Sequence, residues 1–224
     1  MKVKKILNRT EYIETEIKRS KRKFDYCKVS YEDVSNFDKL IKLHHKYEEI
    51  GPILCLGTRN GREIDLFRNI IFGNPIINTL IKILEVKRYG STSLFPFFES
   101  FDRSNTNDIR DKSVIGVEIN PDAKRTDTHI CSFDEMPENW ENKFKIIYSN
   151  SFDQSQDPEK TAQEWLRIAH PGAIIIVGFS YTAATDTDPV GEIEIDDLKE
   201  LFGGKIIYYS NLHGFYHNVA IQID

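Results

Sequence analysis

Short apolar runs alternate with amphipathic segments along the chain from residue 51 onward. The early runs are almost continuously apolar, which is typical of strands covered on both faces. Seven strands are predicted on this basis: Ile53–Leu56, Val114–Glu118, His129–Cys131, Lys145–Ser149, Ala173–Phe179, Lys205–Ser210 and Asn218–Ile223. About seven residues separate the last two, too few for a helical crossover, so these two must pair antiparallel. The pattern predicts an α/β fold with a seven-stranded, mostly parallel, doubly wound sheet and an antiparallel C-terminal strand pair.

The segments between the strands carry helix signals. Apolar spacing and terminal residues predict four helices: Glu63–Phe72, one from Asp157 to Pro171-Gly172, one from Asp196 or Asp197 to Gly203, and one behind Ser35. Asp157 followed by Pro158 is the clearest of these signals, because it combines an N-cap with a first-turn proline.

The chain divides into two parts by composition. We expect residues 1–50 to form a basic, helical N-terminal cap, and residues 51–224 to form the sheet domain with an insertion at residues 74–112. The insertion contains a helical pattern, Ile76–Val86, and a cluster of phenylalanines between Phe95 and Phe101. Exposed phenylalanines would promote association, so this cluster is either a lid over an apolar acceptor molecule or a buried joint to the core or to a second subunit of a homo-oligomer.

Composition narrows the class of protein. With 224 residues, 40% hydrophobic and 29% charged, the chain is long enough to bury a core and too polar for a membrane protein. No apolar run approaches the ~18–20 residues of a membrane span, and the first residues turn acidic too soon for a signal peptide. Three cysteines without metal-ligand spacing indicate a reducing compartment. We therefore expect a soluble, cytoplasmic protein with no membrane contact.

Charge is distributed unevenly. Residues 1–28 hold ten basic and four acidic residues, a net +6, whereas the remainder carries a net −11. A basic cluster between Lys18 and Lys23 either contacts an anionic partner, such as nucleic acid or a phosphorylated substrate, or forms a solvated face.

The first strand leads into a glycine turn, CLGTRNGRE, at residues 55–63. In an open parallel sheet the ligand site lies beyond the carboxyl ends of the strands, and glycine permits close approach of the backbone there. Gly57 and Gly61 meet that requirement, although the dinucleotide fingerprint G-x-G-x-x-G is absent. The second strand ends in Glu118, where an acidic side chain can hold both ribose hydroxyls of a nucleoside.

Taken together, residues 51–224 outside the insertion resemble the class I S-adenosyl-L-methionine-dependent methyltransferases, which have a Rossmann-like fold. The motif order and the antiparallel final pair carry the resemblance. The turn is most similar to a branch that reads C-L-G-x-R-x-G with a YSNS motif after the fourth strand. Cys55, Arg59 and Ser132 stand where the wider family usually has an acid, a glycine and an acid.

The resemblance implies a set of residues around the cofactor S-adenosyl-L-methionine. It places Gly57, Thr58 and Gly61 at the methionine and ribose, Glu118 at the ribose, Ile119 on the adenine, Ser132 and Phe133 at the adenine edge, and Asn150, Ser151 and Phe152 behind the methionine and methyl group. Arg59 either meets the methionine carboxylate or pairs with Glu63, four residues further on.

Methyl transfer to a hydroxyl or amine can require a general base. Asp153, just past the fourth strand, is the candidate, and its alternative role is to cap the loop. The six histidines have no metal-ligand spacing, so we expect no metal.

The sequence thus favours an enzyme that methylates a small-molecule acceptor, such as a saccharide or metabolite hydroxyl. The alternatives are an RNA or nucleotide methyltransferase, for which the basic N-terminus is the argument, and a catalytically inactive cofactor-binding or interaction subunit. An NAD-dependent oxidoreductase is disfavoured by the missing fingerprint and the antiparallel final pair.

Overall fold

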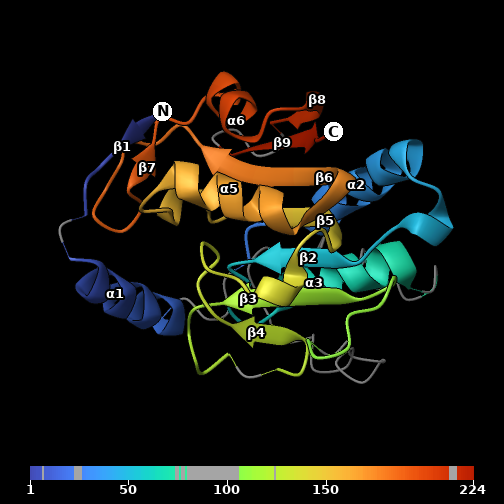
Figure 1. Cartoon of the computed structure of the whole chain (residues 1–224), viewed down its shortest axis with the longest axis horizontal. Coiled ribbons are helices and arrows are strands. Elements are labelled where there is room, and N and C mark those ends of the chain that lie inside the picture. Colours follow the sequence, from blue (N-terminus) through green and yellow to red (C-terminus); the bar gives the residue numbers. More distant parts are fainter. Residues whose placement is uncertain are drawn as a thin grey trace.

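A seven-stranded sheet forms the centre of the molecule (Figure 1). The computed structural model describes residues 1–6, 8–22, 27–73, 76, 79, 106–123, 125–211 and 216–224. The strand order is β4-β3-β2-β5-β6-β9-β8, and β9 runs antiparallel to both of its neighbours while the other adjacent pairs are parallel. The strands are β2 (Ile53–Leu56), β3 (Val114–Glu118), β4 (Thr128–Ile130), β5 (Phe144–Ser149), β6 (Ala169–Ser180), β8 (Lys205–Ser210) and β9 (Tyr216–Gln222). The predicted fold class is confirmed.

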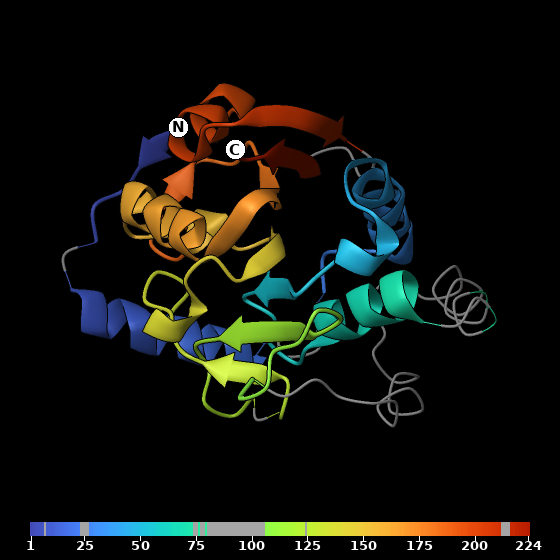
Figure 2. The ribbon, with the colours of Figure 1, turned by 45° about the vertical axis from the view of Figure 1, so that its right-hand side comes forward.

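Helices cover both faces of this sheet (Figure 2). They are α2 (Tyr31–His44), α3 (Arg62–Phe67, continued by a π-helical turn Arg68–Phe72), α5 (Pro158–Ile168) and α6 (Ile195–Phe202), with 3₁₀ turns at Tyr47–Glu49, Glu138–Trp140 and Phe152–Gln154. The side chains of β2 alternate between two cores because successive residues of a strand point to opposite faces. Leu54 and Leu56 pack with α5 and α6, whereas Ile53 and Cys55 pack with α2 and α3.

Three helix ends differ from the sequence prediction. α2 starts at Tyr31, not behind Ser35, because Ser30 and Asp33 form a capping box. The helix that begins after Asp157 ends at Ile168, three residues before Pro171-Gly172, because Ala169 already pairs with β5. The last predicted helix is capped by Glu194 through a box with Asp197, two or three residues before the predicted start at Asp196 or Asp197.

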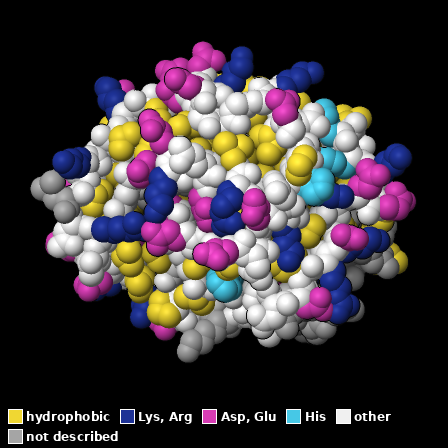
Figure 3. All heavy atoms as spheres, viewed as in Figure 1, with side chains coloured by type: hydrophobic (Ala, Val, Ile, Leu, Met, Phe, Trp, Pro, Cys, Tyr) yellow, Lys and Arg dark blue, Asp and Glu magenta, His cyan; other side chains and the backbone are white. Residues whose placement is uncertain are grey.

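The N-terminal segment is tied to the sheet domain. A short strand β1 (Lys2–Val3) pairs antiparallel with β7 (Val190–Gly191), and the helix α1 (Arg9–Arg22) lies beside the carboxyl ends of β2, β3 and β4 (Figure 1). Basic side chains of this segment pair with acidic groups of the remainder: Lys2–Glu192, Lys4–Asp186, Arg9–Asp134, Arg19–Asp188 and Lys21–Asp122. Acidic and basic groups are accordingly interspersed on the face in Figure 3. Much of the basic charge of the cap is therefore used within the molecule.

Two expectations fall partly outside the described residues. Most of the 74–112 insertion lies outside the described residues. This part includes the Phe95–Phe101 cluster and the predicted helix Ile76–Val86, except for Ile76 and Thr79. Within the part of the chain that is described, no helix has the length and apolar character needed to cross a membrane.

A buried ion-pair network joins α3 to the segment between β3 and β4. Arg125 binds Asp65 at 2.6 Å and Asp127 at 2.8 Å, and Arg68 binds Asp127 at 2.8 Å. Burial opposes ionisation of Asp127, but the hydrogen bonds and charges of Arg125 and Arg68 outweigh it and hold its pKa below the usual range. Paired in this way, the network fixes the start of β4 relative to α3 and the π-helical turn that continues it.

We predict that Asp127→Asn lowers the free energy of unfolding by about 3–5 kcal/mol, because it leaves buried guanidinium groups without their carboxylate. Since the pKa of Asp127 is lowered on folding, this stabilisation is present above about pH 4 and is lost as the pH falls. Urea denaturation at pH 7 measures the loss. Asp108→Asn, which removes an exposed partner of Arg110, is the control and should leave the free energy of unfolding close to that of wild type. Equal losses in the two variants would contradict the prediction.

Candidate functional site

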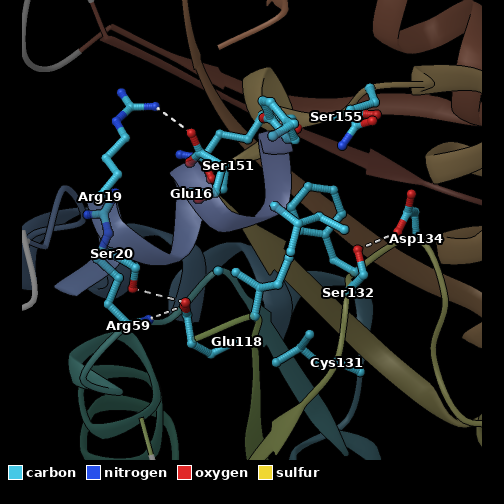
Figure 4. A pocket seen from close by; sticks show the side chains of 18 of the residues that line it. Glu16, Arg19, Ser20, Arg59, Glu118, Cys131, Ser132, Asp134, Ser151 and Ser155 are labelled. Carbon is cyan, nitrogen blue, oxygen red and sulfur yellow. Dashed lines mark hydrogen bonds and ion pairs between the residues drawn. The ribbon is translucent and has the colours of Figure 1, made fainter. Parts of the chain in front are cut away.

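A cavity opens where the strand order reverses, beyond the carboxyl ends of β2, β3 and β5 (Figure 4). The empty space of the cavity, counted together with its open mouth, is about 730 Å³. Its walls come from α1, the turn after β2, the end of β3, the loop after β4 and the loop after β5. The lining residues are Arg9, Tyr12, Ile13, Glu16, Arg19, Ser20, Gly57, Arg59, Val117, Glu118, Ile119, Cys131, Ser132, Phe133, Asp134, Ser151, Gln154, Ser155 and Gln156.

The glycine turn brings β2 close to the loop after β5. Gly57 has a φ of +74°, and a Cβ there would lie 2.6 Å from Ser151 Oγ, so a side chain at this position would collide with the cavity wall. Gly61 has a φ of +79° but does not line the cavity, because it caps α3 and leaves room for the Arg125 guanidinium. Thr58 is fully buried against Gly116 of β3 and also lies outside the lining.

Glu118 connects three segments at the floor of the cavity. Its Oε2 accepts a hydrogen bond from the Arg59 backbone N–H at 2.7 Å. Its Oε1 accepts from the Asn120 N–H at 3.1 Å and from the Ser20 hydroxyl of α1 at 3.0 Å (Figure 4). Because the carboxylate is 3% exposed and fixed by backbone donors, it is preorganised to accept hydrogen bonds from a ligand.

The loop after β4 forms a second wall. Ser132 and Phe133 of this loop line the cavity, as does Ile119, which directly follows β3. The Ser132 hydroxyl bonds to Asp134, and the Phe133 carbonyl accepts from the Trp165 indole at 3.0 Å, which holds this loop against α5. Burial raises the pKa of the neighbouring Cys131 thiol to about 12, so this cysteine is a neutral wall residue.

Residues after β5 divide between the cavity and the core. Ser151 lines the cavity and donates to the Asn150 side chain at 3.1 Å, while Asn150 itself stays behind it. Phe152 is fully buried between Trp165 and Phe202 and does not reach the cavity. Asp153 lies outside the lining too; burial raises its pKa to about 6, a shift to which Asp188 adds and which Lys28 and Arg19 oppose.

One face of α1 closes the cavity, and sequence reasoning did not assign its residues. Tyr12, Glu16 and Ser20 are 8%, 7% and 7% exposed and recur every four residues, as one side of a helix does. The Tyr12 hydroxyl donates to the Gln154 carbonyl at 2.7 Å, which joins α1 to the loop after β5. The spacing of these residues at every fourth position of a charged helix could have marked a buried face in the sequence. It could not have identified the cavity that this face covers.

Charged groups are concentrated at the Ser20 end of α1. Arg19 binds Asp188 through two hydrogen bonds of 2.7 and 2.8 Å, whereas its contact with Glu16 is 3.5 Å long. Burial raises the pKa of Glu16 to about 7, and the charges of Arg19 and Arg59 offset this only in part. The pKa of Glu63 is likewise raised to about 7 by burial, with Arg59 again lowering it. Arg59 thus lies within electrostatic range of both carboxyl groups.

Metal-ligating side chains do not gather in the described ranges. No group of three or more His, Cys, Asp or Glu residues there has the arrangement of a metal site.

Solved structures share this architecture at low sequence identity. No protein-family model matches the chain, and no curated protein does. A Burkholderia thailandensis 1,6-didemethyltoxoflavin-N1-methyltransferase, solved with 1,6-didemethyltoxoflavin and S-adenosylhomocysteine, aligns with a TM-score of 0.55 and 11% identity over 99% of this chain and 93% of its own. A Thermotoga maritima S-adenosylmethionine-dependent methyltransferase, described as a possible histamine N-methyltransferase, gives 0.51 and 12% over 96% and 99%. The chain therefore has the class I methyltransferase fold.

We predict that Glu16 makes the stability of the protein fall as the pH rises from about 4.5 to 7. Its pKa is higher in the folded state, so folding takes up a proton in this window and the stabilisation is lost above it. Glu16→Gln removes the titration, so its stability relative to wild type should improve by about 1–3 kcal/mol between pH 5 and pH 8. Urea denaturation at both pH values tests this. Glu14→Gln, an exposed site on the same helix, is the control, and a pH-independent difference for Glu16→Gln would refute the prediction.

Proposed function

We propose that the protein is an S-adenosyl-L-methionine-dependent methyltransferase acting on a small-molecule acceptor. The observation that carries the proposal is the position of Glu118. Its fixed carboxylate stands at the end of β3, beside the close-approach turn at Gly57, inside a cavity at the switch point of a class I methyltransferase sheet.

The residues present fit the cofactor. Glu118 would accept hydrogen bonds from the ribose hydroxyls, Ile119, Ser132 and Phe133 would surround the adenine, and the cradle between Gly57 and Ser151 would take the methionine. Arg59 would meet the methionine carboxylate. Four further residues lie behind the lining and would hold these walls in place: Thr58, Gly61, Asn150 and Phe152. The cofactor, when bound, supplies an activated methyl group on a sulfonium. The residues of this chain align the acceptor and exclude water.

A small acceptor is favoured over a nucleic acid by the lid helix α1. It lies across the cavity and is held at both ends by ion pairs, Arg9 with Asp134 and Arg19 with Asp188. Of the basic cluster between Lys18 and Lys23, Arg19 and Lys21 form ion pairs within the molecule, with Asp188 and Asp122. Tyr12, Glu16 and Ser20 of α1 line the cavity that this helix covers.

Calorimetric titration with S-adenosylhomocysteine tests the proposal. We expect wild type to bind it and not to bind NAD. Glu118→Ala should weaken binding about 10–100-fold, because hydrogen bonds to a charged group contribute roughly 1.5–3 kcal/mol. Glu200→Ala, an exposed glutamate on α6, serves as the control and should bind as wild type does. Absence of binding to S-adenosylhomocysteine and S-adenosyl-L-methionine in wild type would refute the methyltransferase assignment, and NAD binding would favour an oxidoreductase.

A further inference from the structure

Glu16 is a buried carboxyl group that faces the cavity with little compensation. It is 7% exposed and lines the cavity. Within the described chain its ion-pair contact is Arg19, 3.5 Å from Oε1, and that guanidinium is already bound at 2.7 and 2.8 Å by Asp188. A carboxylate in such a place is costly unless a cation reaches it. The cavity is the side from which a ligand cation would come.

The position of Glu16 along α1 locates it over one part of the cavity. Arg9 of α1 contacts Asp134 in the wall after β4, and Ser20 contacts Glu118. Glu16 precedes Ser20 by one helical turn, about 6 Å of axial rise. It lies on the same cavity as Ser151 of the loop after β5, and Figure 4 shows Glu16 and Ser151 on the opposite side of the view from Cys131.

We propose that Glu16 is the residue that recognises positive charge at the methyl-donating end of the cofactor, and that it thereby favours the sulfonium substrate over its neutral thioether product. This inference rests on the proposed function. It gives α1 a role in ligand discrimination in addition to its role as a cover.

The charged groups around Glu16 leave its carboxylate available to a ligand cation. Tyr12 and Arg19 flank it on α1, Arg59 approaches from the turn after β2 and Asp188 from the segment between β6 and β7. Asp153 of the 3₁₀ turn after β5 adds a further carboxyl group near Tyr12 and Asp188. Asp188 already binds Arg19. Burial therefore outweighs the nearby cations, and the pKa of Glu16 is raised to about 7. Preference for a sulfonium should therefore increase from pH 6 to pH 8.

The experiment compares the dissociation constants of S-adenosyl-L-methionine and S-adenosylhomocysteine in wild type, Glu16→Gln and Glu14→Gln at pH 6 and pH 8. The two ligands share the adenosine and the amino-acid groups and differ by the methyl group and the sulfonium charge it creates, so the change in their ratio with pH reports on that charge. In wild type we expect the preference for the sulfonium ligand to grow about tenfold from pH 6 to pH 8, the effect of one partly screened charge pair. Glu16→Gln should lose this growth and keep its affinity for the thioether within about threefold. Glu14→Gln should match wild type.

Two outcomes overturn the inference separately from the proposed function. If Glu16→Gln binds both ligands with the wild-type ratio at pH 8, Glu16 does not sense the sulfonium. If that variant fails to fold, the wild-type pH series decides, and a constant ratio between pH 6 and pH 8 rejects the role. Failure of wild type to bind either ligand would instead refute the proposed function, and the inference with it.

Discussion

The carboxylate of Glu118 is the interaction on which the arrangement of the site depends. It accepts hydrogen bonds from the backbone of the glycine turn at Arg59, from the backbone at Asn120 and from Ser20 of α1. These donors lie far apart in sequence, and one buried carboxylate fixes their relative positions. Such an acceptor requires parallel strands, because only then do the ends of β2 and β3 meet at one edge of the sheet. The cavity thus follows from the sheet topology and from one side chain.

Charge segregation along the sequence becomes charge pairing in the fold. The N-terminal segment is basic and the rest is acidic, and the ion pairs of Arg9, Arg19 and Lys21 join the two. Each of these ion pairs contributes little free energy by itself, but together they determine the position of α1 on the sheet domain. Backbone pairing of β1 with β7 and the bond from Tyr12 to the Gln154 carbonyl add directional contacts. A helix with few apolar residues can therefore cover the cavity.

Strands were predictable because burial on both faces leaves a local signature. The β2 and β3 bounds agree with the prediction at both ends, and β5 differs by one residue. Helix ends were less predictable because tertiary pairing overrides local signals, as where Ala169 joins β6 and ends α5 before Pro171. The turn and Glu118 could be found from sequence, since each sits at a strand end. Glu16 could not, because its significance arises from contact between α1 and loops more than a hundred residues away.

Two of the buried carboxyl groups, Asp127 and Glu16, differ in a way that separates a structural from a functional role. Asp127 is surrounded by guanidinium groups at hydrogen-bonding distance, and its pKa is lowered. Glu16 has one long contact to an arginine already bound elsewhere, and its pKa is raised. The first arrangement stabilises the fold and has nothing left to bind. The second destabilises it at neutral pH and faces the cavity, which is the combination expected when a protein retains a costly group for a ligand. The free energy lost by burying the ionised Glu16 carboxylate is recovered either when the group is protonated or when a cation enters the cavity.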